Sequence, residues 1–158
     1  MTHKELITEV TRFFDIRELV SKCVYDKYQT GAWRFFDPRI LETLLVLRRD
    51  ILRVPLVCNN WKSGGTMQQR GLRENVCEMV RKKTDFDILY ISAHCLGQGL
   101  DLSSPSMTAD QMRASIKKNE DKLPYKVRIE DGKTAKTWLH IDVSCSPEQK
   151  EKILVFKG

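Results

Sequence analysis

The clearest pattern along the chain is a run of apolar positions at helical spacing between residues 38 and 52. The side chains that recur at this spacing are Ile40, Leu41, Leu44, Leu45, Leu47 and Ile51. In front of them, Asp37 supplies an N-cap and Pro38 suits the first helical position. The pattern therefore predicts a helix over residues 38–52, with its apolar face in the core.

Shorter helical patterns precede and follow this segment. Residues 2–14 are typical of a short amphipathic helix or arm, and residues 16–20 continue it into a helical turn. Residues 74–83 predict a further helix whose apolar side chains face inward. Thr108 and Gln111 have the spacing of a capping box, so another helix is expected to begin there and to end near residue 119.

Short apolar runs predict the strands. Residues 54–58 and residues 88–91 each have the length and composition of a strand. Residues 125–129 and 137–143 flank the turn signal Asp-Gly-Lys at 131–133. We therefore expect these last two segments to form an antiparallel hairpin.

These elements predict an α+β fold, with a small, mainly antiparallel sheet and helices packed against it. The tail from Ser144 is expected to pack on the outside as a short helix or strand, with a helix start at residues 147–150. At 158 residues the chain is near the commonest domain size and shows no internal boundary, so one domain over residues 1–158 is expected.

Composition indicates an ordinary soluble protein, with 41% hydrophobic and 30% charged residues. No run of about 18 apolar residues occurs, which argues against membrane insertion. The first residues have no apolar stretch of the kind that a secretory signal peptide needs. We therefore expect a chain made in the cytoplasm.

Charge and cysteine content restrict the alternatives. The net charge of +6 raises nucleic-acid binding as a hypothesis, but the basic clusters are short and a solvated basic face is favoured. Five cysteines without a Cys-x-x-Cys pair indicate neither a disulfide framework nor a thiolate zinc site. Cys95 is considered as a thiol nucleophile, but in a strand it points away from the adjacent His94.

Two histidine segments together offer a metal site. His94 is followed seven residues later by Asp101, with Gly97 and Gly99 between them, and His140 lies in a later apolar segment. We expect each histidine to project from a strand and the glycine-containing loop to bring the carboxylate back beside the imidazole. Two imidazoles and a carboxylate that leave a fourth position open are the ligand set of a catalytic zinc site. Each histidine taken alone is more typical of a core or surface residue.

The same residues resemble a known family. The pattern Ser-x-His-x-x-Gly-x-x-x-Asp at residues 92–101, followed by Trp-x-His-x-Asp at 138–142, resembles the zinc D-alanyl-D-alanine carboxypeptidase family of peptidoglycan peptidases, which includes phage endolysins. Arg-Gly-Leu-Arg at 70–73 is similar to the family's Ser-Gly-Tyr-Arg element. The resemblance covers about residues 14–143, and residues 59–65 look closest to phage or prophage members.

The resemblance implies a hedgehog/DD-peptidase-like zinc fold and a zinc-dependent metallopeptidase, either a DD-carboxypeptidase or an endopeptidase. His94, Asp101 and His140 would bind one Zn²⁺ per chain, and zinc would activate a water as the nucleophile. The implied partner is the peptidoglycan stem peptide. We expect a monomer that acts on the cell wall after release or after delivery by another factor.

Three further residues receive candidate roles. Arg73 matches the family's active-site arginine and would stabilise developing negative charge or bind a substrate carboxylate. Trp138 shares the strand face of His140 and would form a wall of the substrate cleft, and Ser92 would hydrogen-bond within the site. The alternatives are a surface arginine, a core tryptophan and a structural hydroxyl.

The general base is where this chain departs from the family pattern. Relatives carry a glutamate three residues before the last histidine ligand, or a histidine two residues before it, where this chain has Thr137 and Trp138. Glu130 is the substitute candidate, because closing the hairpin brings it roughly opposite Thr137, although an ordinary exposed glutamate is the alternative. Asp142 is expected to orient the His140 imidazole. The alternative function is a non-catalytic, zinc-stabilised module that binds the cell wall or belongs to a phage structure.

Overall fold

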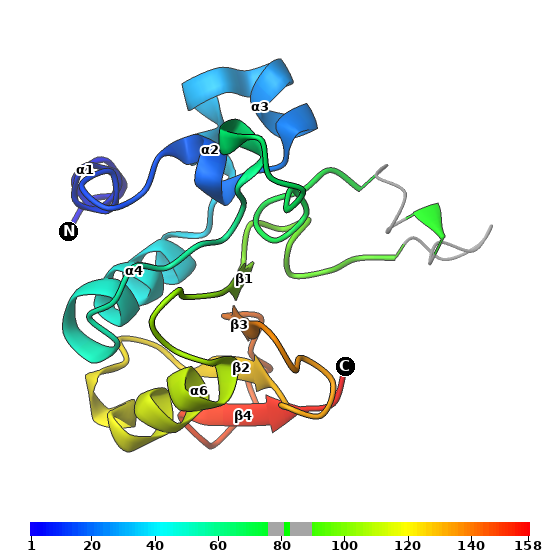
Figure 1. The fold of residues 1–158 in the computed structure, drawn as a ribbon. Coiled ribbons are helices and arrows are strands. Elements are labelled where there is room, and N and C mark those ends of the chain that lie inside the picture. The colour runs from blue at the N-terminus through cyan, green and yellow to red at the C-terminus, as the bar shows by residue number, and fades with distance from the viewer. Residues whose placement is uncertain (76–80, 83–89) are drawn as a thin grey trace.

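A computed structural model of the protein describes residues 1–75, 81–82 and 90–158 (Figure 1). Within these residues lie five α-helices and one four-stranded sheet, so the α+β class predicted from the sequence is confirmed. The expected helix over 74–83 and the apolar run at 88–91 fall largely outside the described residues. No helix in the described part of the chain is long and apolar enough to cross a membrane.

Three short helices open the chain: α1 (His3–Val10), α2 (Ile16–Leu19) and α3 (Lys22–Tyr28). A capping box of Thr2 and Glu5 begins α1, and a second box of Asp15 and Glu18 begins α2. The first helix ends before residue 14, and the predicted turn at 16–20 is a separate helix with its own cap. Figure 1 shows α2 and α3 at the opposite end of the molecule from β2 and β4.

The helix predicted at residues 38–52 is present as α4 (Pro38–Val46), which continues into a π-helical turn at Leu47–Ile51. The carboxylate of Asp37 accepts the backbone N–H of Arg39 at 2.9 Å, which is the expected N-cap bond. The apolar face of this helix is buried in the core, with Ile40 and Leu41 fully buried.

The sheet has the strand order β1-β3-β2-β4. Its strands are β1 (Gly99–Leu102), β2 (Val127–Glu130), β3 (Leu139–Asp142) and β4 (Ile153–Phe156). The antiparallel hairpin predicted from the turn signal is confirmed as the pair β2 and β3. On its other edge β3 pairs antiparallel with β1, and β4 runs parallel to β2.

The predicted capping box begins α6 (Ala109–Lys118), where Thr108 Oγ1 accepts the backbone N–H of Gln111 at 3.2 Å. This helix packs on β3. Its inward residues Met112 and Ile116 are fully buried in the same core as the apolar side chains of the sheet. His140 points to the opposite face of the sheet from this core, which therefore supports its strand from behind.

Two predicted elements differ in the structure. Residues 54–58 do not form a strand: only Val57 pairs, in an isolated bridge with Ser103, since Pro55 has no N–H with which to extend a ladder. The predicted helix start at 147–150 is a turn, because the buried side chain of Gln149 donates to the Val127 carbonyl at 3.1 Å and ties this segment to β2. The tail then continues as β4.

Candidate metal centre

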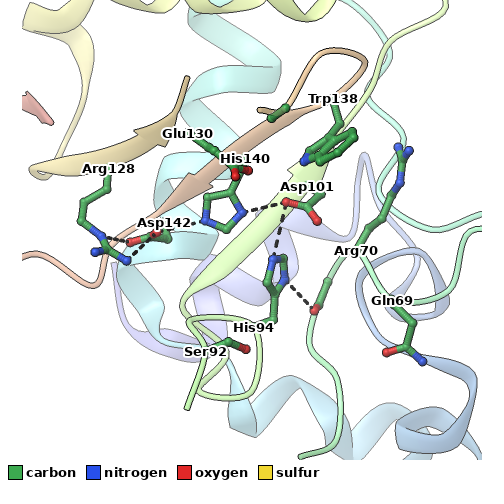
Figure 2. A network of polar contacts seen from close by, with 12 residues as sticks. Gln69, Arg70, Ser92, His94, Asp101, Arg128, Glu130, Trp138, His140 and Asp142 are labelled. Carbon is green, nitrogen blue, oxygen red and sulfur yellow. Dashed lines mark hydrogen bonds and ion pairs between the residues drawn. The ribbon is translucent and has the colours of Figure 1, made fainter. Parts of the chain in front are cut away.

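Asp101 and His140 face each other across two neighbouring strands. Asp101 lies in β1, directly opposite His140 in β3, and directly paired residues share one face of a sheet. Their side chains meet, with Asp101 Oδ1 2.7 Å from His140 Nδ1 (Figure 2). The glycine-containing segment before Asp101 was expected to bring the carboxylate back beside His94, and the structure places Asp101 itself in a strand. A strand pair holds both groups more rigidly than a loop would.

His94 reaches the same point from a turn. The prediction that it projects from a strand is wrong, because residues 93–97 form a turn closed by the bond from Gln98 N–H to the Ala93 carbonyl. Gly97 permits this turn: its φ is +65°, and a Cβ there would lie 2.1 Å from the Phe35 carbonyl oxygen.

The ring of His94 is oriented by its own hydrogen bond. Its Nδ1 lies 3.1 Å from the carbonyl oxygen of Gly71, so Nδ1 carries the proton and donates it. The lone pair of Nε2 therefore points away from the backbone, toward Asp101 Oδ1 at 3.5 Å. A neutral imidazole with one nitrogen donating to a carbonyl is the usual form of a metal-binding histidine.

The three side chains fit the requirements of a metal ion. One ligand atom from each of His94, Asp101 and His140 lies within 4.8 Å of the others. Ligand atoms in a tetrahedral zinc site, with bonds near 2.0–2.1 Å, lie roughly 3.3–3.5 Å apart. The His94 to Asp101 distance already matches, and the shorter contact of His140 would open as a metal replaced its hydrogen bond. This buried group could therefore hold a metal ion.

In the metal-free protein the electrostatics favour a negative charge on Asp101 and a positive charge on His140. Burial alone would raise the pKa of Asp101, but the hydrogen bond from His140 and the adjacent His94 ring hold it well below its ordinary value. Burial opposes the charged form of His140, yet hydrogen bonds to Asp101 and Asp142 raise its pKa to about 9. The His140 ring is therefore a cation between two carboxylates, and a metal ion would take the place of its Nδ1 proton.

Asp142 orients the outer edge of the His140 ring, as the sequence predicted. Its Oδ2 lies 3.0 Å from His140 Nε2, on the side away from Asp101. The fully buried carboxylate also accepts two bonds from Arg128 and the backbone N–H of Ser144. Burial raises the pKa of Asp142, but the bonds from His140 and Arg128 outweigh it and lower the pKa. Asp142 thus stays ionised and fixes Nδ1 toward the metal position.

Glu130 lines the pocket of about 360 Å³ onto which His94, Asp101 and His140 open. The register differs from the prediction, since Arg128 pairs with Asp142 and Ile129 with Ile141. Extended by one residue, this register places Glu130 opposite His140 and not opposite Thr137. The reason is the long connection between the strands, which turns back on itself where the Ala135 N–H donates to the Asp131 carbonyl.

The other predicted residues lie around the same pocket. Arg73, 8% exposed, lines it and donates from Nη1 to the Gln69 carbonyl at 3.0 Å. Half-buried Trp138 lines it, and Figure 2 shows its indole beside Asp101. Ser92 also lines it, but its hydroxyl accepts the Cys95 N–H and so caps the turn that carries His94.

The cysteine considered as a nucleophile lies elsewhere. Cys95 lines a neighbouring apolar pocket together with Leu96 and Phe35, and it is absent from the residues that line the metal pocket. Its Sγ accepts the Ser92 hydroxyl at 3.3 Å. In the described part of the chain the cysteines are free thiols.

Sequence reasoning missed two residues of the site, Arg128 and Phe156. Arg128 reaches Asp142 only because of the observed register, and Phe156 reaches His140 only because β4 pairs with β2. An arginine two positions before Glu130, which shares its strand face, was the one available indication. The pairing of a distant C-terminal strand could not be read from local pattern.

Comparison with known proteins gave no match to a family model, a curated protein or a solved structure. The peptidase family suggested by the motifs therefore stays a prediction. What the geometry adds is that the residues in those motifs converge on one pocket.

Proposed function

We propose that this chain is a zinc-dependent metallopeptidase that hydrolyses a peptide bond in the peptidoglycan stem peptide, with the DD-peptidase-like zinc fold that its motifs resemble. The observation that carries the proposal is the convergence of His94 Nε2, Asp101 Oδ1 and His140 Nδ1 at the wall of an open pocket. His94 and His140 are both buried residues, so the three atoms are held in place at the edge of the core and still open onto the pocket.

The donor set favours zinc over other common ions. Zinc takes imidazole nitrogens and carboxylate oxygens in tetrahedral sites, and catalytic sites use three protein ligands. Calcium and magnesium prefer sites made entirely of oxygen atoms. Two histidines and one aspartate therefore support one zinc per chain.

When bound, zinc would lower the pKa of a water in the open position and polarise the scissile carbonyl. The residues of the chain would do the rest. Glu130 lines the pocket, and its carboxylate would accept the proton of that water. Asp142 would keep the His140 ring fixed throughout the reaction.

Substrate binding is assigned to the polar and aromatic walls. Arg73 would bind a carboxylate of the stem peptide, since Arg73 lines the pocket that also contains the three ligands. Trp138 would form a flat wall for the peptide beside Asp101. Ser92 would act through the turn of His94, because its hydroxyl caps that turn.

The overall charge agrees with this substrate. A net charge of +6 attracts the protein to an anionic cell wall and to stem-peptide carboxylates, and this attraction weakens with salt. The proposed protein is a monomer that meets the wall after release or delivery by another factor. The bond is that of a DD-carboxypeptidase or of an endopeptidase.

A second function is supported by one observation. Thr137, which stands where relatives carry the catalytic glutamate, lines a different pocket with Lys136 and Ser104. The usual position of the base therefore contributes nothing to the metal pocket. If Glu130 does not replace it, the chain would be a zinc-stabilised module that binds the cell wall, or a phage structural module, without hydrolysis.

Mass spectrometry of purified peptidoglycan incubated with the zinc-loaded protein separates the two functions. The peptidase releases new peptide termini or D-alanine, and the His140→Ala variant does not. His3→Ala is the matched control, because His3 lies in α1, outside the site, and should leave the products unchanged. Binding to the wall without any new terminus would favour the non-catalytic module.

A further inference from the structure

Arg128 connects the metal centre to the C-terminal strand. Its Nε and Nη2 donate to the two oxygens of Asp142 at 2.9 and 3.0 Å, a bidentate pair. Its guanidinium carbon lies 4.9 Å from the centre of the Phe156 ring. The Phe156 ring in turn stands at 86° to the His140 ring, with 5.7 Å between their centres.

The sheet register explains why these side chains meet. Arg128 in β2 is paired with Asp142 in β3 on one side and with Leu154 in β4 on the other. Two residues along, Glu130 is paired with Phe156, so Phe156 shares the sheet face of Glu130 and Arg128. The parallel strand β4 therefore places an aromatic ring against the guanidinium that holds Asp142.

The bonds of Asp142 show what Arg128 contributes. The carboxylate is fully buried, and its contacts are His140 Nε2, the Ser144 N–H and the two donors of Arg128. Among the described residues, Arg128 is the one cationic partner of the buried Asp142 charge besides the His140 ring, and its removal would leave that charge poorly compensated. The carboxylate would then turn, and the ring that it orients would turn with it.

We propose that Arg128 is a positioning residue of the metal centre, braced by Phe156, so that strand β4 is required for the His140 ligand to point correctly. The inference rests on metal binding by the three proposed ligands and not on hydrolysis. It adds Phe156, which lies C-terminal to the last motif at residues 138–142, to the site. It also assigns Phe156 a role that a surface strand residue would not have.

Arg17 offers a matched control. It forms the same bidentate pair with Asp15, at 2.9 and 2.6 Å, and its guanidinium lies 5.9 Å from the Tyr25 ring centre. This pair belongs to α2, outside the metal pocket. Arg128→Gln and Arg17→Gln therefore remove the same kind of interaction, one beside the metal centre and one away from it.

The test measures zinc affinity by chelator competition and the visible absorption of the Co²⁺-substituted protein. Arg128→Gln should weaken zinc binding by about 10–100-fold, the usual effect of losing an outer partner of a ligand, and should shift the Co²⁺ bands. Phe156→Leu should cause a smaller loss of the same kind. Arg17→Gln should match the wild type in both measurements.

Wild-type affinity and spectrum in Arg128→Gln would overturn the inference while leaving the proposed function standing. A wild-type protein that binds no zinc would overturn both. If Arg128→Gln does not fold, Arg128→Lys decides: it keeps a cation beside Asp142 but loses the bidentate geometry. An unchanged Co²⁺ spectrum in Arg128→Lys and in Phe156→Leu would then contradict a positioning role.

Discussion

Asp101 and His140 are direct cross-strand partners, and the 2.7 Å contact between Oδ1 and Nδ1 joins β1 to β3 at the centre of the site. Neither residue has to be brought in by a flexible loop, since the sheet itself sets their separation. His94 then completes the group from a turn that is bonded to Gly71. The candidate metal position is thus defined mainly by backbone pairing.

Removing either histidine should abolish tight zinc binding. Loss of an outer partner costs about 10–100-fold in affinity, so we expect His94→Ala and His140→Ala each to lose more than about 100-fold. Chelator competition measures the affinity. His3→Ala should bind like the wild type. Equal zinc affinity in His94→Ala and the wild type would exclude His94 as a ligand.

Glu130→Gln should separate metal binding from hydrolysis. The amide keeps the shape of the side chain but cannot accept a proton, so the rate of stem-peptide cleavage should fall by about 10²–10⁴-fold while zinc affinity stays unchanged. Glu120→Gln is the control, because Glu120 lies in the short 3-10 helix that follows α6. Cleavage at the wild-type rate by Glu130→Gln would assign the base to another group.

Zinc binding should release a proton from His140 and strengthen as the pH rises. The pKa of His140 in the metal-free protein is raised from 6.5 to about 9: burial lowers it, but the bonds to Asp101 and Asp142 raise it more. Between pH 6 and 8 the ring is therefore protonated, and zinc must displace the Nδ1 proton. Affinity should increase roughly tenfold per pH unit over this range from this group alone.

Isothermal titration in buffers of different ionisation enthalpy measures the released proton directly. The apparent binding enthalpy should depend on the buffer, with a slope of about one proton from His140 at pH 7. Under the same conditions the His140→Ala variant should show a smaller slope. A wild-type enthalpy that is independent of buffer would contradict the assignment of His140 Nδ1 as a ligand atom.

Gly97→Ala should destabilise the fold and the site together. Its φ of +65° disfavours any side chain, and a Cβ would lie 2.1 Å from the Phe35 carbonyl oxygen. The backbone strain alone costs about 1–3 kcal/mol, and the contact adds to it. Thermal unfolding should show a lower Tm, and zinc affinity should fall because His94 lies in the same turn.

Gly31→Ala is the control for this substitution, since a Cβ at Gly31 meets nothing within 4 Å. Its Tm should equal or exceed that of the wild type, because alanine restricts the unfolded chain more than glycine does. If Gly97→Ala melted at the temperature of Gly31→Ala, the turn would not need glycine.

Local signals in the sequence predicted the helices well. The apolar period of residues 38–52 and the cap at Asp37 correspond to α4 and its π-helical turn, and the box of Thr108 and Gln111 begins α6. These features depend on residues within one or two turns of each other. Residues 54–58 show the limit, because an apolar run with Pro55 in it forms only one bridge.

Pairing between distant segments was harder to predict from the sequence. The turn signal predicted that β2 and β3 form a hairpin, but the hydrogen bonds inside the long connection set a register that local spacing could not supply. The parallel pairing of β4 with β2 had no signal at all. Arg128 was missed because of the register, and Phe156 because of the pairing of β4.

The metal group was predictable because its residues have a rare chemistry at a recognisable spacing. The motifs indicated His94, Asp101 and His140 as one ligand set. In the structure one ligand atom from each lies within 4.8 Å of the others. The elements that hold them were predicted less well, since His94 lies in a turn where a strand was expected. Side-chain chemistry was thus easier to infer than the backbone beneath it.

X-ray absorption at the zinc edge of the loaded protein tests the central claim most directly. The account predicts one zinc per chain with two imidazole nitrogens and oxygen ligands at about 2.0–2.2 Å. His94→Ala should lose one of the two imidazoles from the spectrum. A wild-type protein that takes up no zinc, or a zinc with sulfur ligands near 2.3 Å, would contradict it.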